Sequence, residues 1–401
     1  MAIYLIVGNG VAGNAAAETI RKIDSQGRIL MFSREKYHFY YVPALPEFLS
    51  GEKQIKDFTI HNEKWYEKNG IDLHLDAEIT EIEAAQAKAV TLRGEKIPYD
   101  KLLLACGGNS FIPPIPGCKL EGVFTLRTIA DAEAIRERAK RSQKMVVIGG
   151  GLLGLEAGNG LRKAGLEISV VEFFPRLLPR QTDVAAAAIL QKRMEEMGFH
   201  FYLGAKTREI VREKDGLGVS LEGGEKLQAE MVLISAGVRP EITLAKSLNL
   251  PCDKGIKVDD TMETPIKGIY AAGDLVEHRG RVYGIWPASM EQGRVAGANM
   301  AGQDTKYQGT LPSNTLKVAG IDLVAAGEID PDGKMESIVA KDDARKTYRK
   351  FVLQDRFLIG AILLGNTRGS DEIQKAIKAQ RNVSSFKENL ADEAFDFARL
   401  K

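Results

Sequence analysis

The chain has 401 residues, more than one ordinary hydrophobic core accommodates, so two or three domains are expected. Hydrophobic residues make up 44% and charged residues 27%, and the formal net charge is +1, which predicts a globular protein without an overall field for nucleic acid or an acidic membrane surface. No apolar run reaches about 18 residues, so no membrane-spanning helix is expected. The three cysteines lie far apart, without a CxxC pair or metal-ligand spacing, which predicts no metal site and a reducing, cytoplasmic location.

The chain begins with a short apolar run at residues 3–7, followed by GNGVAG and an alanine-rich amphipathic stretch. This order of strand, glycine turn and helix is that of a βαβ unit. In a dinucleotide-binding turn the first glycine allows the bend, the second lets the backbone approach a pyrophosphate, and the third lets the helix pack on the strand. We therefore expect Gly8, Gly10 and Gly13 to hold a pyrophosphate at a helix N-terminus, and Glu35, after the next strand, to hold a ribose.

The segment that follows departs from the βαβ pattern. Residues 79–97 alternate apolar and polar side chains, which predicts antiparallel strands. Residues 99–108, YDKLLLACGG, predict a buried strand that ends in a glycine turn, and the proline-rich residues 111–117 predict a stiff linker. A helix over residues 131–141 leads to the next unit.

The strand, glycine turn, helix and strand pattern then recurs. Here Gly149, Gly151 and Gly154 stand in the glycine turn and Glu172 ends the following strand. A carboxylate at that place accepts hydrogen bonds from both ribose hydroxyls and repels a 2′-phosphate, so the sequence predicts NADH in preference to NADPH. Because one such pattern alone is weak evidence, the pair is the stronger indication of two nucleotide-binding domains.

The identity of the first nucleotide is indicated by the later part of the chain. After a helix over residues 184–197 and a buried strand over 231–237, the chain returns through IYAAGD, which places Asp274 where a carboxylate can bond a ribityl hydroxyl of a flavin. A helix then begins at Trp286, and its N-terminus would stabilise negative charge at the flavin's pyrimidine edge. These features predict FAD in the first domain and NAD(H) in the second. The structural alternatives are a strand-end cap for Asp274 and ordinary core packing for Trp286.

Six motifs occur in a characteristic order: GNGVAG, LLLACGG, VVIGGGLLGLE, LISAGVRPE, GIYAAGD and WPASMEQGR. From about residue 2 to at least residue 330 the chain resembles the FAD/NAD-linked pyridine nucleotide–disulfide oxidoreductase superfamily, in particular the NADH:rubredoxin reductases and the flavin portion of NADH-dependent nitrite reductases. The resemblance implies that Glu156 lies near the nicotinamide and flavin rings, and that Arg127 contacts FAD. It also places the turn with Cys106 and Gly107 at FAD, although Cys106 replaces the family's threonine. The alternative for Glu156 is a carboxylate on a helix surface.

Thiol–disulfide chemistry requires a thiolate at the flavin and an acid for the leaving thiol. No cysteine precedes Cys106 and no histidine follows His278, so we expect no redox-active cysteine pair in this chain and a structural role for Cys106. Val42 stands where the superfamily often carries a basic residue beside the flavin, and the nearest charges are Glu47 and Lys53, to which the sequence assigns no role.

A flavin accepts two electrons as hydride and can release them one at a time. FAD, NADH and no further redox centre therefore favour electron exchange between NAD(H) and a one-electron partner. We expect this partner to be an iron–sulfur or rubredoxin-like protein or subunit, with the direction left open. The alternatives are an NADH oxidase that reduces oxygen or peroxide, whose relatives rely on a reactive cysteine, and a flavin redox sensor or assembly subunit without turnover.

The expected fold class is α/β, with two Rossmann-like dinucleotide-binding domains and a small α+β domain. Residues 1–112 and 239–309 are expected to form the FAD-binding domain, residues 113–238 the NAD-binding domain, and residues 310–401 the C-terminal α+β domain with a helical tail. Apolar residues recur along the tail, residues 384–401, which could form a helix that docks on a partner or could pack on its own domain.

Overall fold

A computed structural model describes residues 1–318, 320–392 and 394–400. The chain divides into two compact units, each assembled from three separate segments. The first unit consists of Met1–Val42, Gln54–Asn109 and Val238–Thr310, and the second of Pro43–Lys53, Ser110–Gly237 and Leu311–Lys401.

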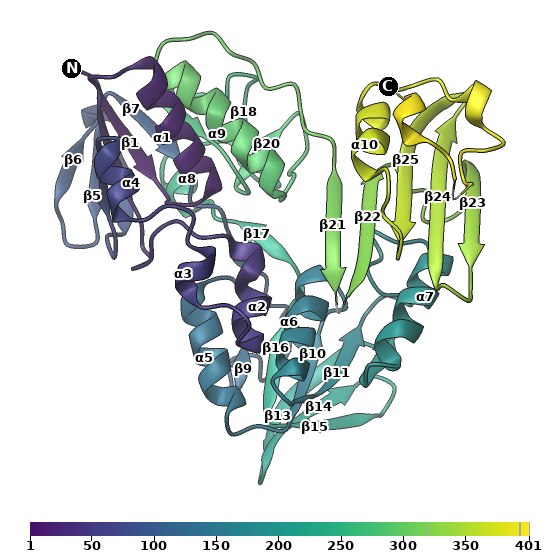
Figure 1. Cartoon of the computed structure of the whole chain (residues 1–401). Helices are drawn as coiled ribbons and strands as arrows, with labels where there is room; N and C mark the ends of the chain where they lie inside the picture. Colours follow the sequence, from purple (N-terminus) through teal and green to yellow (C-terminus); the bar gives the residue numbers. More distant parts are fainter. Residues whose placement is uncertain (319, 393, 401) are drawn as a thin grey trace. The chain divides into compact units, whose positions relative to one another are not determined.

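The first unit is built around a parallel sheet with the strand order β19-β7-β1-β2-β3 (Figure 1). Successive side chains of a strand point to opposite faces. Tyr4 and Ile6 of β1 therefore lie in a core with residues of α1 and α9, whereas Leu5 and Val7 lie in the core on the other face. Because both faces of this sheet are covered, its central strands are apolar runs without alternating polar residues. The strands are β1 Ile3–Val7, β2 Arg28–Phe32, β3 Ile71–His74, β7 Lys101–Leu104 and β19 Ile269–Ala271.

Small residues allow α1 and α9 to pack side by side (Figure 1). A Cβ added to Gly293 would lie 2.3 Å from the carbonyl oxygen of Ala12, and one added to Gly297 would lie 2.6 Å from that of Ala16. Since Cβ atoms do not approach backbone oxygens so closely, these glycines fix the position of α9 along α1. The helices of this unit are α1 Val11–Ile23, α3 Ile55–Phe58, α4 Glu63–Lys68, α8 Thr243–Ser247 and α9 Trp286–Met300.

The second face of the parallel sheet carries an antiparallel sheet of β4, β5 and β6, which confirms the strands expected within residues 79–97. Two further short pairs, β8 with β17 and β18 with β20, complete the unit. The remaining elements are β4 Ile79–Glu83, η2 Ala84–Gln86, β5 Lys88–Thr91, β6 Lys96–Pro98, β8 Gly108–Ser110, β17 Val238–Pro240, β18 Ile256–Val258 and β20 Val276–His278, and the 3-10 turn η1 Val42–Ala44 spans the point at which the chain first leaves this unit.

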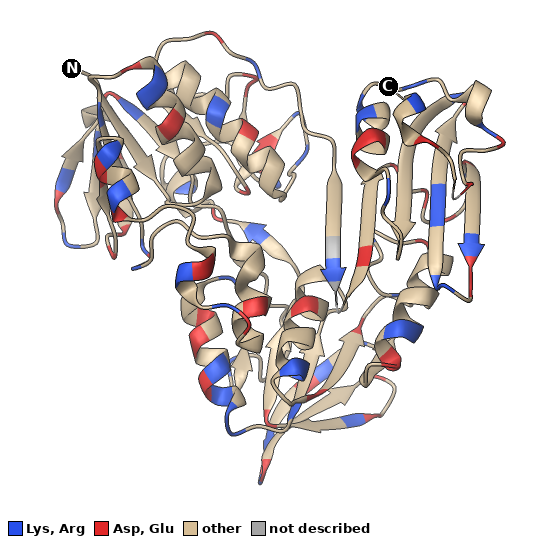
Figure 2. Ribbon diagram, viewed as in Figure 1, with Lys and Arg blue, Asp and Glu red and all other residues tan. Residues whose placement is uncertain are grey.

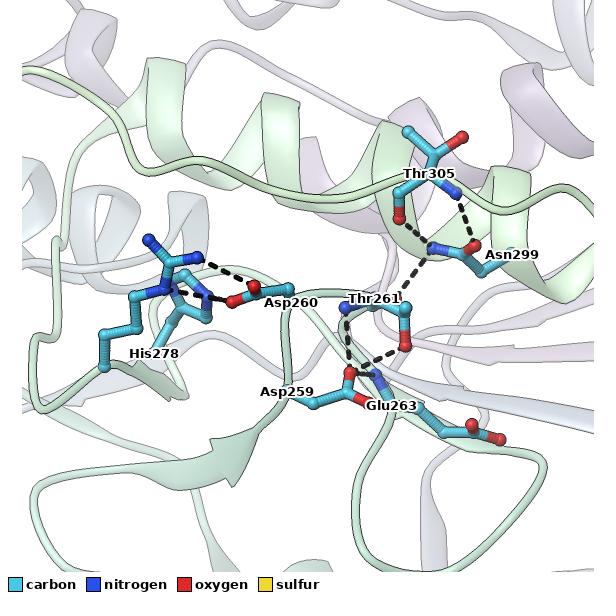
Figure 3. A network of polar contacts seen from close by, with 8 residues as sticks. Asp259, Asp260, Thr261, Glu263, His278, Asn299 and Thr305 are labelled. Carbon is cyan, nitrogen blue, oxygen red and sulfur yellow. Dashed lines mark hydrogen bonds and ion pairs between the residues drawn. The ribbon is translucent and has the colours of Figure 1, made fainter.

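A polar network secures the far end of α9 (Figure 3). The Asn299 side-chain amide on α9 donates to the carbonyl oxygen of Thr261 at 3.0 Å. The adjacent Asp260 carboxylate lies 2.8 Å from Nε2 of the buried His278 and accepts a hydrogen bond from Arg279 at 2.7 Å. Arg279 and His278 together lower the pKa of Asp260 to about 2, so it stays ionised. The network ties the C-terminal end of α9 to Thr261 and, through the adjacent Asp260, reaches His278 of β20.

The second unit contains another parallel sheet, with the order β12-β11-β10-β16-β9. The strand before the glycine turn, β10, is again central and lies next to the strand that follows the helix, β11. An antiparallel sheet of β13, β14 and β15 accompanies it. The elements are α2 Leu45–Ser50, β9 Val123–Phe124, α5 Ile129–Ala139, β10 Lys144–Ile148, α6 Leu152–Lys163, β11 Glu167–Glu172, α7 Val184–Glu195, β12 Phe199–Leu203, β13 Thr207–Glu213, β14 Gly216–Leu221, β15 Lys226–Ala229 and β16 Met231–Ile234.

The C-terminal part of the second unit is an antiparallel sheet with the order β21-β22-β25-β24-β23, against which α10 packs (Figure 1). Side chains on one face of this sheet form a single core with α10. The elements are β21 Ser313–Val318, β22 Ile321–Gly327, β23 Glu336–Asp342, β24 Thr347–Gln354, β25 Phe357–Leu364, α10 Ser370–Lys378, η3 Ser384–Phe386 and η4 Phe397–Leu400.

The tail packs on its own domain. Within residues 384–392 and 394–400 the only regular elements are two short 3-10 turns, so the expectation of a helical tail is wrong. Its apolar side chains fill the core of the antiparallel sheet instead, and of the two alternatives for the tail the structure therefore selects the second. The buried tail residues are Leu390, Phe395, Phe397 and Leu400.

A buried ionic cluster joins α7 to β24 within the second unit. The Asp183 carboxylate caps α7 by accepting the amide of Ala186 at 2.9 Å, and it accepts the Tyr348 hydroxyl at 2.6 Å. Lys350 Nζ lies 3.5 Å from the same carboxylate and donates to the carbonyl oxygen of Asp330 at 2.6 Å. Burial and the neighbouring Asp183 raise the pKa of Tyr348, which therefore remains a donor.

Charged side chains of both signs are interspersed along the helices of each unit (Figure 2), in keeping with the small net charge. Among the described residues, no helix combines the length and the apolar character needed to cross a membrane.

Candidate functional site

The turn between β1 and α1 has the geometry of a pyrophosphate cradle. Gly8 has a φ of +122°, and a Cβ there would lie 2.1 Å from the carbonyl oxygen of Ala105. A Cβ on Gly13 would lie 2.1 Å from the carbonyl oxygen of Gly8. At Gly10, the N-cap of α1, no described atom outside its chain neighbours lies within 4 Å of an added Cβ, and no described side chain caps the helix. Close backbone contacts within the protein thus require glycine at the first and third positions. At the second position there is room for a ligand, and the amides of the first turn of α1 can bind an anion.

The turn between β10 and α6 repeats this geometry. Gly149 has a φ of +119°, and a Cβ there would lie 2.3 Å from the carbonyl oxygen of Ser235. A Cβ on Gly154 would lie 2.3 Å from the carbonyl oxygen of Gly149, while a Cβ on Gly151 would have no described atom outside its chain neighbours within 4 Å. The residues present at both turns therefore fit the pyrophosphate of a dinucleotide.

Each cradle is accompanied by a carboxylate, which in the second unit ends the second strand and in the first unit follows it. Glu172 is buried, and its two oxygens accept the amides of Gly150 at 2.6 Å and of Phe174 at 2.8 Å. In the first unit, Glu35 accepts the hydroxyl of Tyr40 at 2.9 Å. Since each carboxylate oxygen has two lone pairs, these bonds orient the groups and leave capacity for ribose hydroxyls.

We expect Glu172→Gln to raise the NADPH to NADH ratio of kcat/KM by about tenfold or more, because a like-charge repulsion worth about 1.4 kcal/mol corresponds to a factor of ten. The matched control is Glu167→Gln at the exposed start of the same strand, which should leave the ratio unchanged. Steady-state kinetics with both nucleotides measure the effect. A wild-type enzyme that uses NADPH as well as NADH would contradict the assigned role.

In the first unit, the turn after β19 is held by α9. Gly273 has a φ of +100° and its amide donates at 2.9 Å to the side-chain oxygen of Gln292, which is 1% exposed. The Ser289 hydroxyl donates to the Asp274 carboxylate at 3.1 Å. Asp274 therefore lies at the N-terminal end of α9, the helix that packs on α1. This position agrees with either of the two expected roles, a cap at the end of the strand or a contact with a ribityl hydroxyl.

Trp286 is the first residue of α9 and lies in an aromatic cluster. Its ring stacks on Phe39 with centroids 5.7 Å apart and meets the edge of Tyr41 at 5.1 Å. Residues 286–289 carry no charge, and no described side chain caps the helix. Trp286 therefore packs on the core of the first unit and at the same time marks a helix N-terminus that favours negative charge.

The turn with Cys106 and Gly107 ends β7. The Cys106 thiol lies 3.6 Å from the carbonyl oxygen of Val7, and burial, together with the charge of Glu241, raises its pKa to about 12. A thiol with that pKa is protonated at neutral pH and is a poor nucleophile. Arg127 belongs to the second unit, in the segment that caps α5, and its contact with FAD stays a prediction.

Glu156 is half-buried in the second turn of α6. Burial and the charge of Glu47 raise its pKa from 4.5 to about 7, against the opposing effect of a backbone hydrogen bond from Lys317. Both protonation states are therefore populated near neutral pH.

This shift predicts a pH-dependent stability. The pKa of Glu156 is higher in the folded chain than its ordinary value of 4.5, so its contribution is fully present below that pH and is lost as the pH rises through about 7. Glu156→Gln should therefore match the wild type in unfolding free energy at pH 5 and exceed it by about 2 kcal/mol at pH 8. Urea denaturation at both pH values measures this; an equal difference at the two pH values would exclude a shifted Glu156.

A group of hydrogen-bonded side chains at the first glycine turn was not predicted from the sequence. The Tyr66 hydroxyl on α4 lies 2.8 Å from the side-chain oxygens of both Asn9 and Asn14, and the Asn14 amide donates to Asn9 at 2.9 Å. Tyr66 is buried, which raises its pKa. These hydrogen bonds restrain the turn around Gly10. No sequence signal connects Tyr66 with residues so far away in the chain, and the same holds for Gln292 and Gly273.

The two cradles agree with comparisons to known proteins. Residues 3–293 match the family described as pyridine nucleotide-disulphide oxidoreductase. The chain belongs to this family. Residues 312–381 match the rubredoxin NAD+ reductase C-terminal domain, which corresponds to the antiparallel sheet of the second unit.

Members of the family provide closer comparisons. The assimilatory nitrate reductase electron transfer subunit of Bacillus subtilis is 35% identical over 390 residues, which are 97% of this chain and 51% of that protein. The NADH-rubredoxin oxidoreductase of Clostridium acetobutylicum is 32% identical over 386 residues, 95% of this chain and 96% of that one. The crystal structure of the ferredoxin reductase for the CYP199A2 system from Rhodopseudomonas palustris superimposes with a TM-score of 0.90 at 26% identity, covering 100% and 99% of the two chains.

The chain spans about half the length of the first curated relatives, 51% and 48%. Pyridine nucleotide-disulphide oxidoreductases use FAD and NAD(H), so the predicted family, fold class and cofactors are confirmed.

Proposed function

We propose that this chain is a cytoplasmic, FAD-dependent NADH oxidoreductase that exchanges electrons between NAD(H) and an iron–sulfur or rubredoxin-like protein partner, with the direction left open. The observation that carries this proposal is the repeated cradle. In both units the middle glycine, Gly10 or Gly151, opens onto free space at an uncapped helix N-terminus among the described residues.

The cofactors are assigned by what accompanies each cradle. Only the first is followed by a segment with the features proposed for a flavin site, namely the Asp274 turn and the N-terminus of α9, within the described residues. When bound, FAD supplies the step from two-electron to one-electron transfer. We assign FAD to Gly8, Gly10, Gly13, Glu35, Cys106, Gly107, Arg127, Asp274 and Trp286, and NAD(H) to Gly149, Gly151, Gly154 and Glu172.

The protein's own groups prepare these sites in different ways. Glu172 is oriented by two backbone amides to accept ribose hydroxyls and to repel a 2′-phosphate. The N-terminal turn of α9 favours negative charge near Trp286, and Glu156 provides a carboxyl group that exchanges a proton near neutral pH. We propose the domain boundaries given by the sequence, with residues 113–238 as the NAD-binding domain.

The partner is inferred from the redox groups that this chain lacks. It has three cysteines, fewer than the four that usually hold an iron–sulfur cluster, and the Cys106 thiol has a pKa of about 12. Support also comes from the Clostridium acetobutylicum relative, a NADH-rubredoxin oxidoreductase that matches this chain over nearly its whole length.

The test compares acceptors under one set of conditions. The FAD-loaded protein is given NADH anaerobically with rubredoxin or with a ferredoxin, and separately with oxygen, and the initial rates are measured. We expect rapid reduction of at least one iron protein and slow oxygen consumption. Oxygen reduction at a rate equal to the best protein acceptor would favour the oxidase, and failure of NADH to reduce the bound flavin would favour the sensor.

A further inference from the structure

The sequence contains three Asn–Gly steps, at residues 9–10, 69–70 and 159–160. At such a step the backbone nitrogen of the glycine can attack the side-chain carbonyl carbon of the asparagine, because glycine has no side chain that hinders the approach. The asparagine then loses ammonia and becomes an acid. Hydrogen bonds to the glycine nitrogen or to the asparagine amide restrain this reaction, so the three steps can be compared by those bonds.

Two of the steps are restrained in this way. The Asn69 side-chain amide donates to the carbonyl oxygen of Trp65 at 2.7 Å, and the backbone amide of Gly70 donates to that of Glu67 at 3.0 Å. Gly160 lies inside α6, where the backbone amides are engaged in the hydrogen bonds of the helix. In both steps the attacking nitrogen is therefore already occupied.

The first step has neither restraint within the described residues. The Asn9 side-chain nitrogen is buried without a hydrogen-bond partner there, and the Gly10 amide donates no hydrogen bond in that part of the chain. A Cβ added to Gly10 would have no described atom outside its chain neighbours within 4 Å. Because a buried donor without a partner costs free energy, departure of the Asn9 amide group relieves a cost.

The carbonyl oxygen of the same side chain is held by donors. Asn9 Oδ1 accepts a hydrogen bond from the Asn14 amide at 2.9 Å and lies 2.8 Å from the Tyr66 hydroxyl. Attack on the carbonyl carbon places negative charge on this oxygen, and donors aimed at such an oxygen stabilise the state in which the charge develops. The Tyr66 hydroxyl also lies 2.8 Å from the Asn14 oxygen, but the developing charge on Asn9 attracts its one proton more strongly.

We propose that Asn9 is a site of spontaneous deamidation that is active while FAD is absent and that prevents later uptake of FAD. The Gly10 nitrogen forms a bond to the side-chain carbon of Asn9, the bond from that carbon to Nδ2 breaks, and ammonia leaves. Water then opens the cyclic imide to an aspartate or an isoaspartate at residue 9, and no electron is gained or lost.

The consequence for FAD rests on the proposed function. The product carries a carboxylate in the turn proposed to hold the pyrophosphate, where like charges repel. The isoaspartate form also lengthens the backbone next to Gly10, which displaces the amides of the first turn of α1. The reaction would therefore convert chains that remain without FAD into chains that cannot bind it.

The experiment incubates the full chain at pH 8, with and without FAD, and follows the three Asn–Gly steps by mass spectrometry of peptides from the same digest. In the protein without FAD, we expect acid to form at Asn9 at least about tenfold faster than at Asn69 or Asn159, a difference of about 1.4 kcal/mol in barrier. With FAD bound, Asn9 should keep its amide. The fraction of acid at residue 9 should equal the fraction of chains that no longer take up FAD.

Three variants test the parts of the inference. Tyr66→Phe removes a donor to the Asn9 oxygen and should slow deamidation there about fivefold, the effect of one hydrogen bond, without changing the rate at Asn69. Asn9→Asp should fold but be purified without FAD. Asn62→Asp is the matched control, because aspartate caps α4 as well as asparagine does and the change adds the same charge away from the turn; it should retain FAD.

The inference is overturned if the protein without FAD reacts at Asn9 no faster than at the other two steps, if Tyr66→Phe leaves the rate unchanged, or if Asn9 reacts equally fast with FAD bound. If the wild type never takes up FAD, the proposed function fails, while the ranking of the three steps still decides whether Asn9 is the reactive residue. That ranking is measured in wild-type protein, so it does not depend on the folding of a variant.

Discussion

Replacing Gly154 with alanine should leave FAD bound and abolish reduction by NADH, whereas replacing Gly13 with alanine should yield protein without FAD. In the two cradles the added Cβ would lie 2.3 Å from the Gly149 carbonyl oxygen and 2.1 Å from that of Gly8. Each contact forces the helix away from its strand and moves the amides that would bind the pyrophosphate. Flavin content of the purified protein and the rate of flavin bleaching by NADH measure the two effects.

The matched control is Gly158→Ala on α6. A Cβ there would meet only side-chain atoms, at 3.3 Å or more, so both FAD content and NADH reduction should be retained. The two variants are expected to have opposite effects on FAD binding, so the pair tests which unit holds which cofactor. If Gly154→Ala lost FAD while Gly13→Ala kept it, the assignment of cofactors to the two units would have to be reversed.

Asp183→Ala should destabilise the second unit by about 3 kcal/mol, the sum of a lost helix cap and a lost buried hydrogen bond to a charged group. The substitution removes the acceptor for the amide of Ala186 and for the Tyr348 hydroxyl, and it takes one of two carboxylates away from the buried Lys350. Urea denaturation followed by circular dichroism gives the change in the free energy of unfolding.

Asp183→Asn provides the comparison, because the amide oxygen can still cap α7 or accept the Tyr348 hydroxyl. We expect it to lose less stability than the alanine variant, and both to retain FAD, since the cluster lies in the second unit. A loss below about 1 kcal/mol for Asp183→Ala, the size of a single cap, would mean that the cluster contributes little to holding β24 against α7.

The features that could be predicted from the sequence are local ones. A glycine turn between an apolar run and an amphipathic stretch predicts its own geometry, because the bend at Gly8 or Gly149 and the helix packing at Gly13 or Gly154 involve residues close together in the chain. The antiparallel strands within residues 79–97 were visible for the same reason, since alternation is a local pattern.

The parts that could not be predicted depend on contacts between distant residues. Tyr66 meets Asn9 only because α4 packs near the first turn, and nothing in its own surroundings indicates that. The cluster of Asp183, Tyr348 and Lys350 likewise joins segments far apart in the chain.

The structure of the tail could not be predicted for a different reason. Its spacing of apolar residues suits a helix face as well as a folded-back segment. Only the core formed by the antiparallel sheet decides between them, and that core buries the tail with two short 3-10 turns as its only regular elements in residues 384–392 and 394–400.

The central proposal is that one polypeptide binds FAD at the first glycine cradle and NAD(H) at the second, and that NADH reduces the bound flavin. The most direct measurement is an anaerobic titration of the FAD-loaded protein with NADH, followed by the visible absorbance of the flavin. The account predicts complete bleaching by NADH and much weaker bleaching by NADPH at the same concentration. A protein that cannot take up FAD, or one whose bound flavin keeps its colour in excess NADH, would contradict it.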